Sequence, residues 1–147
     1  VHATGLIHRD LKPDNVILRG NDAPVLIDFG VALLAGERHQ PGTGTPAYMA
    51  PEQARSGKVD ARADLYALGV MAHEMLTGAR PDPSRSNLPF TGTARLRAIR
   101  SSLTAAATAP EIADLIARLL APRPRLRPAS AAEVGSAFAH AAEAQRG

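Results

Sequence analysis

Three short motifs in a fixed order constrain this chain more than any other feature of its sequence. Residues 8–15 read His-Arg-Asp-Leu-Lys-Pro-Asp-Asn, residues 28–30 read Asp-Phe-Gly, and residues 50–52 read Ala-Pro-Glu. The first motif brings a carboxylate, an ammonium group and an amide into one short loop, and such groups accept protons, neutralise phosphates and hold divalent cations. Chance does not explain three such motifs in this order, so they guide the interpretation of the remaining residues.

The motifs resemble the catalytic loop, the magnesium loop and the end of the substrate-binding P+1 loop of protein kinases. The resemblance runs from about residue 2 to about residue 141 and covers the carboxyl-terminal lobe of a bacterial serine/threonine kinase of the eukaryotic-like (Hanks) type. It implies that residues 1–147 are a partial protein kinase domain. The implied fold is α+β and mainly α-helical, a large lobe with a small β-hairpin at the catalytic loop.

The resemblance assigns three residues to the transfer of a phosphoryl group from ATP to a protein hydroxyl. Asp10 matches the catalytic aspartate, which orients the substrate hydroxyl and accepts its proton. Lys12 matches the lysine of serine/threonine kinases that contacts the γ-phosphate. Thr45 lies in the segment that resembles the P+1 loop, and it matches a hydroxyl that bonds both Asp10 and Lys12. Lys12 and Thr45 therefore imply specificity for serine and threonine.

ATP and Mg²⁺ are the cofactors that the resemblance implies. Asn15 and Asp28 match the two magnesium ligands, and they supply the hard oxygen donors that suit Mg²⁺. Ile17 is expected to form the floor under the adenine ring, with Met71 and Met75 packed behind it. With Lys12 on the γ-phosphate, these residues make up the expected nucleotide site.

Five further residues match structural positions of the family. Asp64 matches the aspartate at the start of a buried helix that braces the backbone of the catalytic loop. His8 and Phe29 match stacked core positions that link the catalytic loop to the magnesium loop. Glu52 and Arg127 match a buried ion pair between the Ala-Pro-Glu motif and a late loop. Removing one partner of such a pair strands a buried charge, so we expect this pair to matter for stability.

Arg9 is also taken as structural. In the family, an arginine before the catalytic aspartate often receives a phosphate from the activation loop. Residues 31–42 contain no Ser, Thr or Tyr, so only Thr43 precedes Thr45 as a phosphate acceptor. We therefore expect activation without phosphorylation in the middle of this loop. Glu37 is expected to be a solvated surface side chain, with a fixed anion that partly substitutes for the phosphate on Arg9 as the alternative.

A hairpin and an irregular loop are expected in the first third of the chain. Residues 16–18 and 25–27 are short apolar runs that flank a Gly-Asn-Asp turn, which predicts a hairpin. This hairpin carries Asn15 at one end and Asp28 at the other. Residues 31–47 are rich in Gly and Pro, so they predict an irregular loop.

The rest of the chain is expected to be helical. Residues 61–77 are apolar on most faces, which predicts a buried helix. Residues 79–93 read as a loop and residues 94–103 as a short helix. Capping boxes at residues 108–111 and 130–133 predict two further helix starts. The inward positions of these last two helices are Ile112, Leu115, Ile116, Leu119, Val134 and Phe138.

Composition excludes several classes of function. The chain has no cysteine, which excludes disulfides, thiolate metal sites and a cysteine nucleophile. Its formal charge is +3, but the basic residues are scattered without an aromatic-interleaved stripe, so we expect no nucleic-acid partner. No apolar run is as long as a membrane helix, so a cytoplasmic location is expected, with membrane anchoring of a full-length form as an alternative. The histidines without a metal-ligand spacing receive no function: His2, His39, His73 and His140.

The glycine-rich loop, the strand lysine and the helix glutamate that complete a kinase have no counterpart in these residues. The expected partners are therefore a missing small lobe in the full-length protein and protein substrates that carry Ser or Thr. Two functions are consistent with this pattern. The first is a serine/threonine kinase present as a carboxyl-terminal lobe. The alternative is a catalytically inactive kinase remnant that acts as a protein-interaction module. In either case we expect negligible kinase activity from the isolated chain.

Overall fold

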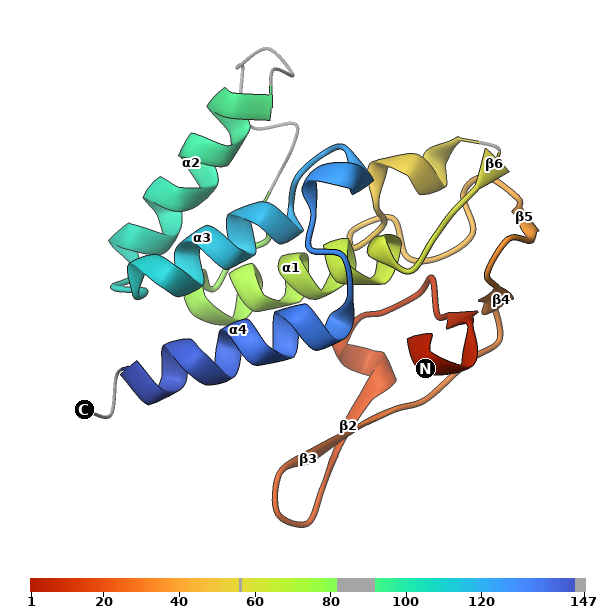
Figure 1. Ribbon diagram of the computed structural model, residues 1–147, viewed down its shortest axis with the longest axis horizontal. Helices are drawn as coiled ribbons and strands as arrows, with labels where there is room; N and C mark the ends of the chain where they lie inside the picture. Colours follow the sequence, from red (N-terminus) through yellow and green to blue (C-terminus); the bar gives the residue numbers. More distant parts are fainter. Residues whose placement is uncertain (56, 82–91, 145–147) are drawn as a thin grey trace.

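The computed structural model describes residues 1–55, 57–81 and 92–144, and it has the mainly helical α+β architecture that the sequence predicts. Helices gather on one side of the molecule, and short strands and 3-10 turns form the other side (Figure 1). No described helix is both long and apolar enough to cross a membrane. The α-helices are α1 (Arg62–Thr77), α2 (Gly92–Ala105), α3 (Pro110–Leu119) and α4 (Ala131–Ala144).

The strands form three antiparallel pairs, β1 with β4, β2 with β3, and β5 with β6. The segment 31–47, predicted to be irregular, contributes β4 and β5, so that prediction was wrong in part. Their partners, β1 and β6, anchor this segment to the body of the lobe. The strands are β1 (Leu6–Ile7), β2 (Val16–Arg19), β3 (Ala23–Leu26), β4 (Leu33–Leu34), β5 (Arg38–His39) and β6 (Gly57–Lys58). The 3-10 turns are η1 (His2–Thr4), η2 (Pro13–Asn15), η3 (Pro51–Ala54) and η4 (Pro124–Leu126).

The predicted hairpin is present as β2 and β3, and it projects away from the helices (Figure 1). Its turn residues Asn21 and Asp22 have φ values of 73° and 58°, a left-handed conformation that short polar side chains tolerate. At the open end, the Ile27 N–H donates to the carbonyl of Asn15 at 3.0 Å. The hairpin therefore brings Asn15 next to the segment that carries Asp28.

The core is built around α3. One face of α3 packs Ile116 and Leu120 into a cluster with residues of α1 and α2, and the other face packs Leu115 and Leu119 toward α1 and α4. Helix α1 approaches α3 closely at Gly69, where an added Cβ would lie 2.7 Å from the Cβ of Leu119. The predicted inward residues of α3 and α4 are thus largely buried, although Ile112 and Phe138 are only partly covered.

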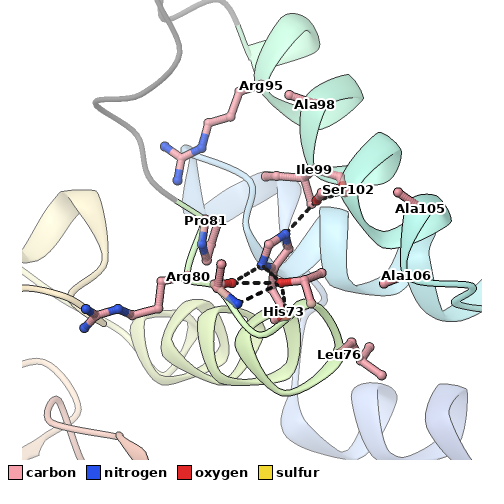
Figure 2. Close-up of a pocket in the computed structure, with 12 residues that line it drawn as sticks. His73, Leu76, Arg80, Pro81, Arg95, Ala98, Ile99, Ser102, Ala105 and Ala106 are labelled. Atoms are coloured by element: carbon pink, nitrogen blue, oxygen red, sulfur yellow. Dashed lines mark hydrogen bonds between the residues drawn. The ribbon is translucent and has the colours of Figure 1, made fainter.

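His73 fastens the end of α1 to α2, a role that the sequence did not indicate. Its ring is buried, and Nε2 lies 2.7 Å from the Ser102 hydroxyl while Nδ1 lies 2.8 Å from the Ala79 carbonyl (Figure 2). The neighbouring Thr77 hydroxyl also reaches Nδ1, at 3.2 Å. These contacts give both nitrogen atoms of the buried His73 ring a hydrogen-bond partner, at the base of the pocket between α1 and α2.

Three expectations about helix ends were wrong. Helix α2 begins at Gly92 and ends at Ala105, two residues beyond each predicted end, while residues 82–91 of the predicted loop lie outside the described residues. The capping box at residues 108–111 does not form. Pro110 occupies the first position of α3, so Ala109 becomes the cap, and the buried Thr108 hydroxyl has no partner among the described residues.

The capping box predicted at residues 130–133 forms with one changed partner. The Ser130 hydroxyl accepts from the Glu133 N–H at 3.2 Å, but the Glu133 carboxylate reaches the N–H of Ala129 in place of that of Ser130. The end of α1 also departs from the prediction of a fully buried helix. Met75 is 81% exposed and does not pack behind Ile17, because the last turn of α1 lies beyond the elements that cover its first three turns.

Candidate active site

The side chain of Asp64 holds the backbone of the catalytic loop through hydrogen bonds. This carboxylate lies in the first turn of α1, and it accepts the N–H of His8 at 2.9 Å and that of Arg9 at 2.8 Å. His2 adds a third contact, with its Nε2 atom 2.7 Å from the same carboxylate. Arg9 has φ 65°, a strained value for a residue with a side chain, and the two bonds hold it there. The backbone conformation just before Asp10 is thereby fixed.

Asp10 lies at the centre of a polar cluster with Lys12 and Thr45. The Thr45 N–H donates to Oδ1 of Asp10 at 2.6 Å, and the Lys12 ammonium lies 3.1 Å from Oδ2. Lys12 also donates to the Thr45 hydroxyl at 2.9 Å. Partial burial acts to raise the pKa of Asp10, but hydrogen bonds from Thr45 and Lys12 outweigh burial and lower this pKa below its ordinary value. The carboxylate is therefore held in its ionised form.

Gln53 is a member of this site that the sequence gave no signal for, because a single glutamine after a motif carries no recognisable pattern. Its side chain is buried, and it donates to the Arg9 carbonyl at 2.9 Å while accepting the Ala50 N–H at 3.0 Å. One amide therefore joins the catalytic loop to the segment that presents Thr45. Gly44 allows this approach, because its φ is 117° and an added Cβ would lie 2.7 Å from the Arg9 carbonyl oxygen.

Asn15 and Asp28 are the residues here that could hold a magnesium ion. The buried Asn15 donates through Nδ2 to the Asp10 carbonyl at 2.8 Å and contacts Oδ2 of Asp10 at 3.4 Å. This leaves its amide oxygen as the donor for a cation. Asp28 is exposed, with φ 59°, and its carboxylate accepts the Gly30 N–H at 3.2 Å. In the described residues no group of three His, Asp or Glu side chains could form a metal cage. A site with two protein ligands suits Mg²⁺, which keeps waters and phosphate oxygens as its other ligands.

His8, Phe29 and Ile17 differ in how far they are covered. His8 is fully buried, with Nε2 3.0 Å from the Ile27 carbonyl. Its ring centroid lies 4.9 Å from that of Phe29, but the planes are tilted by 57° and Phe29 is 41% exposed. The expectation that both rings are stacked in the core was therefore wrong for Phe29. Ile17 is 49% exposed and offers an apolar surface on the outward side of the hairpin.

The Arg9 guanidinium points to the start of the activation loop. Its Nε donates to the Val31 carbonyl at 2.6 Å, and a second nitrogen bonds the same oxygen. Burial lowers the pKa of Arg9, and the charges of Asp64 and Glu37 act against this change. Glu37 also accepts the Leu34 N–H at 3.0 Å, so its carboxylate is fixed by the turn after β4. The Glu37 side chain is nevertheless exposed, and among the described residues it forms no ion pair with Arg9, so a solvated side chain describes it better than a fixed anion does.

The predicted ion pair between Glu52 and Arg127 is present. The guanidinium meets both carboxylate oxygens, at 2.5 and 2.8 Å, and the Arg127 side chain has no exposed surface. Arg127 also donates to the carbonyls of Ala121 and Arg62, and it lies 4.9 Å from the ring centroid of Tyr66. The pair connects η3, which follows the Thr45 segment, to the helical core.

Comparison with known proteins shows the family of the chain. The family model described as the protein kinase domain matches residues 1–139. The chain is 34% identical to the serine/threonine-protein kinase PknL of Mycobacterium tuberculosis over 148 aligned residues, which cover 92% of this chain and 35% of the relative. It is 36% identical to PknB of Mycolicibacterium smegmatis over 140 residues, covering 90% of this chain and 22% of that protein.

A higher identity covers a shorter stretch. The chain is 54% identical to the serine/threonine-protein kinase Pkn1 of Myxococcus xanthus over 90 residues, which are 54% of this chain and 13% of the relative. The chain therefore spans between 13% and 35% of the length of these three curated relatives.

Proposed function

This chain belongs to the protein kinase domain family, among the serine/threonine kinases, and we propose that it supplies the catalytic lobe for phosphoryl transfer from ATP to Ser and Thr hydroxyls of proteins. One observation carries the proposal. Lys12 and the Thr45 N–H both lie within 3.1 Å of the Asp10 carboxylate, so the proposed base, phosphate contact and specificity hydroxyl share one cluster. The transfer requires the small lobe that completes a kinase.

In the proposed reaction, the substrate hydroxyl oxygen forms a bond to the γ-phosphorus of ATP while the bond to the β,γ-bridging oxygen breaks. The hydroxyl proton passes to a carboxylate oxygen of Asp10, whose lowered pKa keeps it ionised and able to accept. Lys12 lies beside that carboxylate and would neutralise the charge of the transferred phosphoryl group. Thr45 holds both side chains in place.

The residues present fit a magnesium-nucleotide site. Asn15 and Asp28 would hold the ion through their oxygen atoms, since the Asn15 nitrogen is already engaged by Asp10. When bound, Mg²⁺ neutralises charge on the phosphates. Ile17 would lie against the adenine ring, which its exposed position on β2 permits.

An alternative function has an observation of its own. Four apolar side chains of the strand region are exposed, and exposed apolar side chains favour a protein partner where they gather into one patch. A non-catalytic interaction module would bind its partner through such side chains without phosphoryl transfer. The four residues are Ile17, Leu18, Phe29 and Leu34.

A transfer assay separates the two functions. The full-length protein with its small lobe is incubated with Mg²⁺, labelled ATP and a Ser/Thr protein substrate. We expect Asp10→Asn to lower the rate by about 10²–10⁴-fold, because the general base is lost. Asp14→Asn is the matched control, since Asp14 is an exposed carboxylate in the same loop and should leave the rate unchanged. Equal rates for Asp10→Asn and the unmodified protein would reject the catalytic role.

A further inference from the structure

A groove of about 880 Å³ lies on the side of the lobe opposite the hairpin. Its lining residues come from three segments that are far apart in the sequence: η3, the start of α2, and the loop that contains η4. The groove is separate from the Asp10 cluster, and the roles proposed above do not use it. Its described lining residues are Pro51, Glu52, Arg55, Thr93, Arg95, Leu96, Pro122, Arg123, Pro124 and Leu126.

The groove carries a net positive charge. Three arginines line it, whereas Glu52 is the one acidic residue among its described lining residues. Both oxygens of that carboxylate are engaged by Arg127, so Glu52 does not neutralise the arginines. Within residues 1–55, 57–81 and 92–144, neither Arg55 nor Arg123 forms an ion pair.

The arginines are distributed so that they can act together. Arg55 and Arg123 are exposed on opposite segments of the wall, and Arg95 is steadied by a 2.6 Å bond to the Tyr66 hydroxyl. Guanidinium groups pair with carboxylates in a bidentate geometry, which favours an acidic ligand.

Apolar side chains between the arginines restrict the ligand further. Leu126 is 53% exposed at the groove, and prolines and Leu96 line it nearby. No described lining residue is aromatic, so bases would find no stacking platform. The surface therefore complements a polypeptide with both carboxylates and aliphatic side chains better than it complements a nucleic acid.

We propose that this groove binds an acidic segment of a partner protein, with carboxylates on Arg55, Arg95 and Arg123 and aliphatic side chains on Leu126 and its neighbours. Turn η3 continues directly from the segment that carries Thr45. The groove is therefore joined through a short stretch of chain to the proposed catalytic site, and we propose that a protein held there is a phosphorylation substrate. That last step rests on the proposed function, whereas binding itself does not.

Binding is tested with a fluorescein-labelled peptide of alternating Glu and Leu, measured by anisotropy on the full-length protein. We expect the double variant Arg55→Glu/Arg123→Glu to weaken binding by about tenfold or more, because two attractive charges become repulsive. The matched control is Arg19→Glu/Arg97→Glu, which changes the net charge equally at exposed residues outside the groove and should alter the affinity by less than about twofold.

Three outcomes of the binding test decide against the groove. Equal binding of a peptide with Gln in place of Glu would overturn the charge argument. Equal loss in both double variants, or equally tight binding of a DNA duplex, would indicate a general attraction of polyanions. The Asp10→Asn variant separates this proposal from the proposed function: retained peptide binding without phosphoryl transfer in this variant supports both. An unmodified protein that transfers phosphate but does not bind the peptide rejects only the groove, and undiminished transfer in Asp10→Asn rejects only the proposed function.

Discussion

The Asp10 carboxylate is contacted by the Thr45 N–H, the Lys12 ammonium and the Asn15 amide, and its titration reports on these contacts. We predict that Thr45→Val raises the pKa of Asp10 toward its ordinary value, because the variant removes a hydroxyl that helps to lower it. Carbon-13 NMR of the Asp10 carboxyl gives this pKa directly. Thr43→Val is the control, since that hydroxyl donates to the Gln40 carbonyl at 3.0 Å and should not affect Asp10.

Thr45→Val is also expected to change the free energy of unfolding in a pH-dependent way. The pKa of Asp10 is lower in the folded protein than its ordinary value, so its ionised form contributes stability at pH values above the ordinary aspartate pKa of about 3.9. That contribution is lost as the pH falls through the lowered pKa. Thr45→Val should therefore destabilise the chain at neutral pH, with a difference that shrinks at acidic pH. A difference that is constant with pH would show that the loss of Thr45 acts only through packing.

Among single residues, the sequence predicted side-chain contacts best for charged residues within recognisable motifs. Asp64 and the Glu52–Arg127 pair were identified from their match to family positions, and the structure gives these carboxylates the donors that such positions need. Gln53 was missed, because a buried amide can bond to many backbone groups and no sequence pattern specifies which. Phe29 was wrongly predicted to be buried, because the burial of an aromatic ring depends on which other residues cover it, and the residue type alone does not determine that.

At the scale of elements, Gly69 makes the close contact between α1 and α3 possible. An added Cβ at Gly69 would meet the Cβ of Leu119 at 2.7 Å. We predict that Gly69→Ala lowers the free energy of unfolding by about 1–3 kcal/mol, because α1 and α3 must separate. Urea denaturation followed by circular dichroism measures this change.

The control for Gly69 is a glycine in another helix. Gly135 in α4 has nothing within 4 Å of an added Cβ, so Gly135→Ala should raise the free energy of unfolding by about 0.5–1 kcal/mol through helix propensity alone. Stabilisation by both alanines would contradict the close packing of α1 on α3.

Helix existence was predictable from the sequence, and helix ends were predictable only in part. The apolar spacing in α3 correctly indicated its buried face, with Leu115, Ile116 and Leu119 all covered. Its start was misplaced because two local preferences compete there, the capping preference of Thr108 and the preference of Pro110 for the first helical position. The proline determines the outcome, and the Thr108 hydroxyl is left without a bond among the described residues.

At the scale of the whole molecule, Glu52 and Arg127 tie the catalytic side of the lobe to its helical core. We predict that Glu52→Gln lowers the free energy of unfolding by about 3–5 kcal/mol, because it leaves the fully covered guanidinium without its counter-charge. Thermal denaturation at constant pH would check this value. The exposed pair of Asp114 and Arg100 serves for comparison, and Asp114→Asn should change the stability by less than about 1 kcal/mol. Similar losses in both variants would contradict a special role for the buried pair.

The central claim is that the Asp10 cluster and the two oxygen ligands form a serine/threonine-specific phosphoryl-transfer site. The most direct test identifies the phosphorylated amino acids after incubation of the full-length protein with Mg²⁺, ATP and a protein substrate. We predict phosphoserine and phosphothreonine, no phosphotyrosine, and loss of all product in Asp28→Asn. Phosphotyrosine as the main product, or undiminished transfer in Asp28→Asn, would contradict the claim.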